Sequence, residues 1–289
     1  MPRFLRLSLP ALALALALTG CDAAETGASS ADIQADTEDA AVSIAAAVAL
    51  DGGGALDEIA TSVLGSVPAA SLDGGDGPGD GRPGCTRDRS YDETAMLWTV
   101  TADCRRGSPD RRFFASFSRV STFQFLAAGQ PQQAPAGADA LAYDILSGET
   151  LIRTPQRVHR VTSLTADFDV TDLDMELATV NGTYQRSGAD SLRVRRGERT
   201  VVYTLDLEAT DVRGSRRTYE NWRRAVSGTL TGHYVATITR TDRSGQTVTR
   251  DVDRTFTITF PTGNEEAEIA IDGRRFRANR STGEIASLM

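Results

Sequence analysis

Five acidic residues fall within ten consecutive positions and form a set of side chains that could do chemistry. Carboxylate oxygens are ligands that Ca²⁺ prefers, and two carboxylates on neighbouring rows of a sheet can also act as an acid/base pair. The alternative, which we favour, is the polar face of an alternating strand whose carboxylates pair with arginines across the sheet. We expect no other cofactor, and keep as candidate calcium ligands Asp167, Asp169, Asp172 and Asp174, followed by Glu176.

The two histidines, His159 and His233, could each act as a general base or a ligand. Neither lies in a nucleophile elbow or in a pair spaced for metal binding. With only 2 His and 3 Cys, a multi-ligand zinc site or an iron–sulfur cluster is not expected. We therefore expect the protein not to be an enzyme, with an envelope hydrolase that uses acidic residues as the least favoured alternative. We expect the rings of Trp98, Trp222 and Tyr219 to pack in the protein rather than stack on a sugar.

All 31 basic residues are arginine, and they cluster at 193–199, 213–224, 240–254 and 274–280. Such clusters could line a groove for an anionic polysaccharide, lipid headgroup or nucleic acid. Pairing with acidic residues across the sheet is the interpretation that we favour. Residues 85–289 contain 27 acidic residues and 28 arginines, which is much less basic than nucleic-acid-binding domains usually are. We therefore expect no nucleic-acid partner.

The N-terminus reads as a targeting segment. Arg3 and Arg6 form a positive N-terminal region, and residues 4–18 are an otherwise largely apolar run that is short for a membrane-spanning helix. The sequence Leu18-Thr19-Gly20-Cys21 resembles the lipobox of bacterial lipoproteins. The resemblance covers the first 21 residues and implies cleavage before Cys21 and acylation of that cysteine, which anchors a protein stably through two or more chains. It places the protein in the bacterial cell envelope, and leaves inner and outer membrane undecided.

Two cysteines remain after lipidation, Cys85 and Cys104, and they flank a hairpin expected to turn near residues 94–95. An exported protein lies in an oxidising compartment, which favours a disulfide. Closing a loop of about 20 residues would stabilise the fold by roughly 3 kcal/mol. We predict that this disulfide staples the first hairpin, with two free thiols as the alternative.

The chain divides into five segments. We expect a signal peptide (1–20), a disordered tether (21–36), short helices (37–65), a Gly/Asp-rich linker (66–84) and an antiparallel β domain (85–289). Residues 21–84 contain 12 acidic residues and one arginine, and this charge should hold the domain off anionic lipid headgroups. Within the predicted helices, an apolar stripe should pack on the sheet; it comprises Leu56, Ile59, Ala60, Val63 and Leu64.

From Cys85 onward, apolar and polar residues alternate with a period of two, which is typical of strands with one buried and one wet face. Turns are predicted at Asp272-Gly273, Asn181-Gly182, Ser187-Gly188 and Ser244-Gly245. A change of apolar parity predicts a bulge or turn at Thr171-Asp172. The predicted fold class is mainly β: an antiparallel meander curled into an open barrel or a two-layer sandwich, with one or two short N-terminal helices.

The C-terminal pattern at 255–260, 267–273 and 282–285 is similar to the ends of uncharacterised β-rich bacterial lipoproteins, and implies no activity. The leading functional hypothesis is a non-enzymatic, lipid-anchored binding or scaffolding module. Its expected partners are the membrane, through the N-terminal lipid, and an envelope protein or glycan. The alternative is a barrel that carries an apolar ligand, which would require an enclosed apolar cavity of a few hundred Å³.

Overall fold

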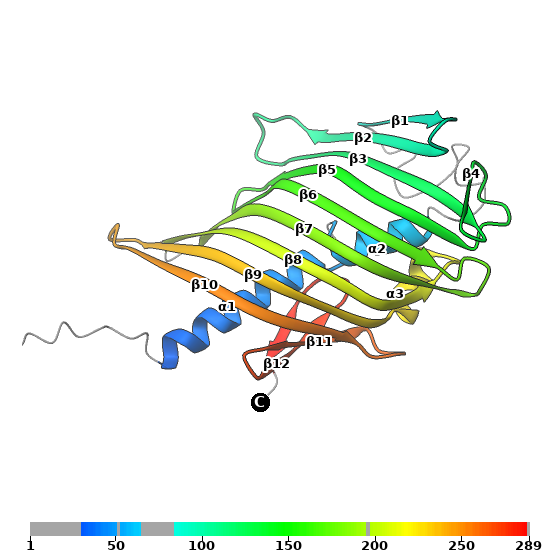
Figure 1. Ribbon diagram of the computed structural model, residues 1–289. Helices are drawn as coiled ribbons and strands as arrows, with labels where there is room; N and C mark the ends of the chain where they lie inside the picture. The colour runs from blue at the N-terminus through cyan, green and yellow to red at the C-terminus, as the bar shows by residue number, and fades with distance from the viewer. Residues whose placement is uncertain (1–29, 51–52, 65–83, 195–196, 288–289) are drawn as a thin grey trace, which may run out of the picture.

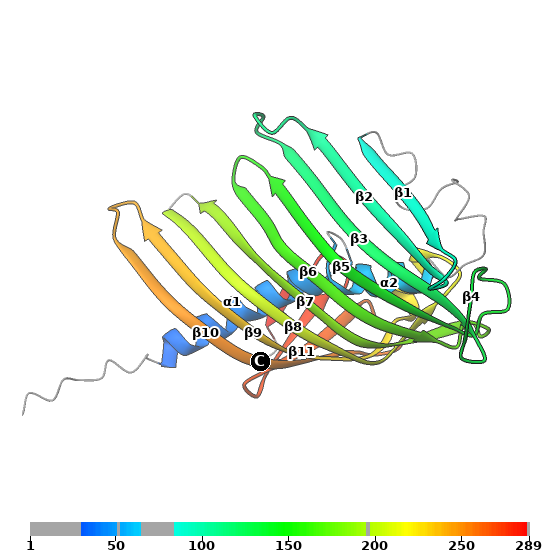
Figure 2. The ribbon, with the colours of Figure 1, turned by 45° about the horizontal axis from the view of Figure 1, so that its top comes forward.

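The fold is one large, curved antiparallel sheet with two helices lying across one of its faces (Figure 1). The computed structural model describes residues 30–50, 53–64, 84–194 and 197–287. Sequential strands pair with one another from β1 to β13, except that the short β4 pairs only with β3. Figure 2 shows that the sheet stays open, so that β1 does not meet the C-terminal strands.

The 13 strands follow the chain order with short connections. They are β1 (Cys85–Asp92), β2 (Leu97–Gly107), β3 (Phe114–Ala127), β4 (Gln130–Gln132), β5 (Ala140–Arg153), β6 (Arg157–Thr171), β7 (Leu177–Val194), β8 (Gly197–Ser215), β9 (Ser227–Asp242), β10 (Thr247–Phe260), β11 (Glu266–Ile271), β12 (Arg274–Asn279) and β13 (Ile285–Ser287). The predicted curled meander is therefore confirmed in its open form, as a single sheet rather than a two-layer sandwich.

Three helices accompany the sheet: α1 (Ser30–Val48), α2 (Ala55–Leu64) and α3 (Tyr219–Ala225). α1 and α2 lie along one face of the sheet, which we call the helix-covered face, while α3 closes the connection from β8 to β9. No helix within the described residues is long and apolar enough to cross a bilayer.

Alternation along each strand decides which side chains meet the helices. On β8, Val201, Leu205 and Leu207 are buried on the helix-covered face, whereas Val202 and Thr204 point to the opposite side. We call that opposite side the open face. An apolar face must be covered to remove it from water, and here α1 and α2 provide the cover.

The apolar stripe predicted for α2 is confirmed at four of its five positions. Leu56, Ile59, Ala60 and Val63 are at most 1 % exposed, and α2 contacts β6, β7 and β8. α1 starts at Ser30 and so includes part of the segment expected to be a disordered tether. Seven of its 19 residues are alanine, which has the highest helix propensity, and two of its aspartates bind the sheet, as described below. The predicted linker at 66–84 lies outside the described residues, except for its last position.

Two glycine pairs that were predicted as turns lie inside strand β7, so those predictions were wrong. Gly182 has φ of 140° at a register shift against β8, and a Cβ there would lie 2.0 Å from the Asp167 carbonyl oxygen. A Cβ on Gly188 would lie 2.4 Å from the Arg160 carbonyl oxygen. These glycines serve close backbone approach rather than chain reversal.

Other local predictions are confirmed. Asp272-Gly273 forms the two-residue turn between β11 and β12, with positive φ at both residues, and Ser244-Gly245 lies in the turn between β9 and β10. The chain turns after Thr171, where Asp172 has φ of 61°. The cysteines of β1 and β2, Cys85 and Cys104, are paired in register and joined by a disulfide.

Candidate functional site

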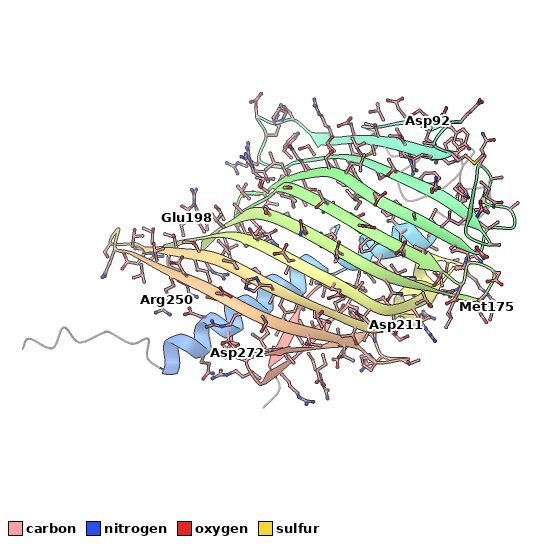
Figure 3. All side chains as sticks on the ribbon, viewed as in Figure 1. Asp92, Met175, Glu198, Asp211, Arg250 and Asp272 are labelled. Carbon is pink, nitrogen blue, oxygen red and sulfur yellow. A yellow bond between two sulfur atoms is a disulfide. The ribbon has the colours of Figure 1, made fainter. Side chains whose placement is uncertain are left out.

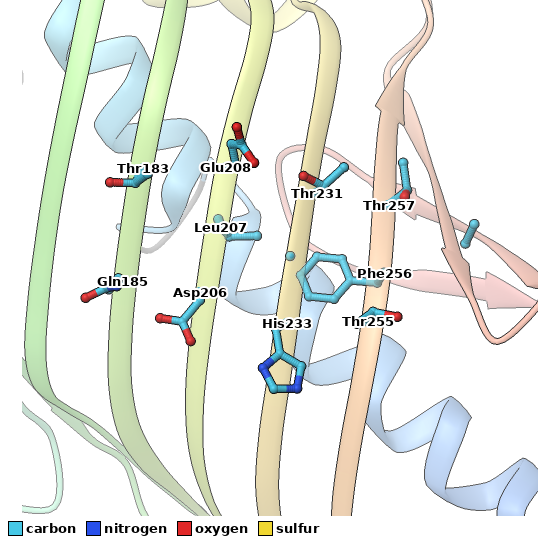
Figure 4. Close-up of a pocket in the computed structure, with 12 residues that line it drawn as sticks. Thr183, Gln185, Asp206, Leu207, Glu208, Thr231, His233, Thr255, Phe256 and Thr257 are labelled. Carbon is cyan, nitrogen blue, oxygen red and sulfur yellow. The ribbon is translucent and has the colours of Figure 1, made fainter.

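A hollow of about 580 Å³ lies on the open face, over strands β7 to β10 (Figure 4). Its polar lining consists of outward-pointing side chains on alternate positions of these strands: Thr183, Gln185, Asp206, Glu208, Thr231, His233, Thr255 and Thr257. It therefore offers hydroxyl, amide, carboxylate and imidazole groups to a ligand, together with apolar surface from Leu207, Phe256 and Ala270. Such a lining suits hydrogen bonding to a polar molecule.

Strand register places these side chains in two cross-strand rows. One row runs from Gln185 through Asp206 and His233 to Thr255. A second row, two residues along, comprises Thr183, Glu208, Thr231 and Thr257. Because adjacent strands lie about 4.8 Å apart, each row presents polar groups at nearly regular intervals.

Gly232 lies between the two rows and determines the packing beneath the hollow. A Cβ on Gly232 would lie 2.6 Å from Cζ of Phe256 and 2.7 Å from Cδ2 of Leu207. Glycine thus allows these two apolar side chains to pack directly against the backbone of β9. These two side chains form the apolar base of the hollow.

His233 is the imidazole among the lining residues of the hollow. Its Nε2 lies 2.6 Å from Oδ1 of Asp253, and the side chain is 42 % exposed. Within the described residues, no threonine or serine hydroxyl is hydrogen-bonded to this imidazole. The pair can therefore bind a ligand, but it lacks the nucleophile–base hydrogen bond of an activated hydroxyl.

The four candidate calcium ligands do not converge. Asp167 and Asp169 lie on the exposed face of β6, whereas Asp172 and Asp174 lie in the turn to β7, where Asp172 accepts a hydrogen bond of 2.6 Å from Thr179. Among the described residues, no group of three or more His, Cys, Asp or Glu is arranged to hold a metal ion. The fold therefore does not bring the four candidate ligands together, because the turn separates the two halves of the cluster.

A third carboxylate lies beside Asp167 and Asp169. Asp144 on β5 is in register with Asp167. Burial raises the pKa of Asp144, and the negative charges of Asp167 and Asp169 raise it further. The hydroxyl of Thr122 acts in the opposite direction, because it donates a hydrogen bond of 3.2 Å to the Asp144 carboxylate. Neither Asp167 nor Asp169 forms an ion pair with an arginine in the described part of the chain, contrary to the cross-strand pairing that we favoured.

Several arginines of the sheet instead face the helices. On α1, Asp39 pairs with Arg199 at 3.3 Å and also with Arg240, and Asp36 pairs with Arg250 at 3.3 Å. Cross-strand pairing does occur elsewhere, for example between Arg275 and Glu268 at 3.0 Å. Asp36 and Asp39 of α1 thus bind the sheet, whereas Glu38 is exposed and accepts a hydrogen bond from Gln34 of the same helix.

A buried ion pair links α2 to the sheet. Glu58 is 1 % exposed and pairs with Arg119 of β3. Burial raises the pKa of the Glu58 carboxyl to about 7, although Arg119 beside it acts in the opposite direction. The second carboxylate oxygen, Oε2, has no hydrogen-bond partner, which adds to the cost of burying this charge.

A second buried network joins three polar residues of β6 and β7. Arg186 donates from Nη2 to Nε2 of His159 at 2.7 Å, and His159 Nδ1 lies 2.5 Å from Oδ1 of Asp190. Since a guanidinium can only donate, Nε2 must accept, and the ring proton lies on Nδ1. Arg186 also donates to the Ala47 carbonyl of α1 at 3.5 Å. Through this bond the network extends from the sheet to α1.

The apolar-carrier alternative requires a large enclosed cavity. The depression between the two N-terminal helices and strands β10 to β12 holds only about 10 Å³, which is about one water molecule. It is lined by residues such as Ala45, Leu56 and Ile258. The helices therefore occupy the place where an apolar ligand would lie.

Trp98 and Trp222, weighed as a sugar-stacking platform, pack within the protein. Trp222 is fully buried, and Trp98 stacks with Phe123 while its Nε1 donates to the Gln133 carbonyl at 3.0 Å. Sequence analysis missed Asp206, Gln185 and the other polar residues of the hollow. The sequence showed that these residues share a parity within each strand. It did not show the register between neighbouring strands, which brings them together in rows.

Comparison with protein-family models, curated proteins and solved structures gives no match to this chain.

Proposed function

We propose that this chain is a non-enzymatic, lipid-anchored protein of the bacterial cell envelope whose open face binds an envelope glycan. The observation that carries the proposal is the contrast between its two faces. The helix-covered face is filled by α1 and α2, whereas the open face keeps a polar hollow of about 580 Å³. The open face is therefore the surface that remains available to bind a ligand.

The polar groups of the hollow support the proposal of a glycan ligand. Threonine hydroxyls, the Gln185 amide and the carboxylates of Asp206 and Glu208 supply donors and acceptors for several sugar hydroxyls. The hollow is wide and open, so that water-bridged contacts add to direct ones. We expect moderate affinity for the glycan, and anchoring of the protein in the same envelope would raise the effective concentration of the two partners.

The anchor is supported by the lipobox-like sequence that ends at Cys21. We expect Cys21→Ser to abolish incorporation of a fatty-acid analogue in bacterial cells and to release the chain from the membrane fraction. The matched control is the double substitution Cys85→Ser/Cys104→Ser, which removes the disulfide of the first hairpin but leaves acylation intact. Unchanged labelling of Cys21→Ser would contradict the anchor.

Glycan binding is tested by co-sedimentation with purified peptidoglycan. Gln185→Ala with Asp206→Ala removes two neighbouring groups of one row, and we expect at least tenfold weaker binding, since each lost hydrogen bond costs about 1 kcal/mol. The control is Thr239→Ala with Thr249→Ala, a hydroxyl pair on the open face outside the hollow, 3.3 Å apart. Equal binding by both double variants would refute the hollow as the glycan site.

A further inference from the structure

The two ends of the sheet carry opposite charge. At one end lie the hairpins β2–β3, β5–β6, β7–β8 and β9–β10, which we call the arginine end and define as residues 105–114, 152–158, 192–198 and 241–248. The described residues of these ranges include three acidic residues and eight arginines: Arg105, Arg106, Arg111, Arg112, Arg153, Arg157, Arg193 and Arg243.

The opposite end is acidic. Its connections span residues 92–97, 127–140, 171–177, 215–227 and 260–266, with four arginines and nine acidic residues. In Figure 3, Asp92 and Met175 mark this end, and Glu198 and Arg250 lie toward the other. A charge difference of this kind orients a protein in the field of a charged surface.

The arginine end also exposes apolar side chains. Phe113, in the β2–β3 hairpin, is 66 % exposed, Val248 is 47 % exposed and Leu192 is 38 % exposed. Beside Phe113, Arg111 and Arg112 are exposed, and neither forms an ion pair within the described part of the chain. Arginines next to protruding apolar residues are the composition that binds the interface of an anionic bilayer.

The chain enters the domain at this same end. The N-terminal half of α1 lies against the ends of β8, β9 and β10 at this side of the sheet (Figures 1 and 2). Asp39 forms ion pairs with Arg199 and Arg240, and Asp36 forms an ion pair with Arg250. Ser30 is nine positions after Cys21, so that even a fully extended chain would span only about 30 Å. A lipid on Cys21 would therefore keep this end near the membrane.

We propose that the arginine end docks on anionic lipid headgroups, with Phe113 entering the interface and Arg111 and Arg112 binding lipid phosphates. The proposal rests on the lipid anchor of the proposed function. Guanidinium groups bind phosphate oxygens in a bidentate manner. Docking at this end would hold the sheet with its open face accessible along the membrane rather than pressed against it.

This geometry changes the expected role of the acidic N-terminal segment. Its net negative charge led us to expect repulsion from anionic headgroups. In the structure, Asp36 and Asp39 are paired with arginines of the sheet, so that part of this charge is already neutralised. The hairpins around them leave the end of the sheet positive.

The test uses the full chain carrying Phe113→Trp, purified from membranes and reconstituted into vesicles with brominated acyl chains. The vesicles contain phosphatidylcholine alone or phosphatidylcholine with phosphatidylglycerol. We expect the emission added by the new indole, relative to the wild-type chain, to be quenched in the anionic vesicles only. High salt should reduce this quenching, because it screens the headgroup charge.

Arg111→Gln with Arg112→Gln in the same background should lower the ratio of docked to undocked protein by about fivefold for each arginine. The matched control is Arg217→Gln with Arg224→Gln, two arginines of the acidic end that are both 69 % exposed. This control removes the same charge and should keep the quenching.

Three results would overturn the docking proposal: no quenching in anionic vesicles, equal quenching in neutral and anionic vesicles, or equal loss in both double variants. Flotation of the chain with the neutral vesicles reports the anchor separately. A chain that floats without quenching retains the anchor and refutes docking. A chain that does not float with neutral vesicles refutes the anchor itself.

Discussion

The two faces of the sheet use charge in opposite ways. On the helix-covered face, charged groups are desolvated and paired: Glu58 with Arg119, and Arg186 with the His159–Asp190 pair. On the open face, Asp167 and Asp169 are exposed, without an arginine partner among the described residues. The same residue types therefore attach the helices on one side and interact with solvent, and in our proposal with a ligand, on the other.

The largest effect is expected on the helix-covered face. Arg119→Ala leaves Glu58 buried without its partner, and we expect a loss of about 3–5 kcal/mol in the free energy of unfolding. The measurement is chemical denaturation followed by tryptophan fluorescence, since Trp222 is fully buried. Replacing both partners by methionine should recover most of this loss, and a double variant as unstable as Arg119→Ala would contradict the explanation.

The pH dependence of stability should report Glu58. Its pKa is about 7 in the folded protein against 4.5 as the ordinary value, so that the folded state binds the proton more tightly. Stability should therefore fall as pH rises from about 4.5 to about 7 and stay level above that, by an amount on the order of 3 kcal/mol. In Glu58→Gln this part of the pH dependence should vanish; an unchanged profile would show that another group causes it.

The ion pairs of α1 should contribute less, because they are partly exposed. Asp39→Asn weakens its interactions with Arg199 and Arg240, and we expect a loss of about 1–2 kcal/mol. Local opening of α1, measured by amide hydrogen exchange, should increase more than opening of the strands. Equal exchange increases in α1 and β6 would argue that the helix has no attachment of its own.

The smallest effect is expected on the open face. Asp167→Asn removes an exposed charge and should change stability by no more than about 0.5 kcal/mol. It also removes one like charge near Asp144, so the pKa of Asp144 should move down toward its ordinary value. A carboxyl-detected NMR titration of both proteins checks the pKa of Asp144. A loss of stability as large as that of Arg119→Ala would contradict the expected difference in energetics between the two faces.

Much of the sheet could be predicted from alternation alone. Val201, Tyr203 and Leu205 share a parity, and so do the polar residues between them, so that each strand's buried side was readable locally. The same parity also places Arg199 on the buried side of β8, a signal that was available but not used. The glycines of β7 misled the prediction because a turn and a close backbone approach both require an absent Cβ.

The sites depended on contacts that are distant in sequence. Asp39 and Arg240 are 201 positions apart, and Glu58 and Arg119 are 61 positions apart. Nothing local tells an acidic helix residue which strand it will bind. The hollow likewise needs four strands in register before its rows exist.

By itself, the amino-acid sequence determined most of the strands, their buried sides, the disulfide of the first hairpin and the helical stripe of α2, because these depend on side-chain period and on neighbours along the chain. Only the tertiary structure decided that the sheet stays open, that the helices fill its apolar face, and that arginines gather at one end. Those features depend on strand register and on which distant charged residues are buried together. The free energies of burial and ion pairing that decide them arise only when the whole sheet has formed.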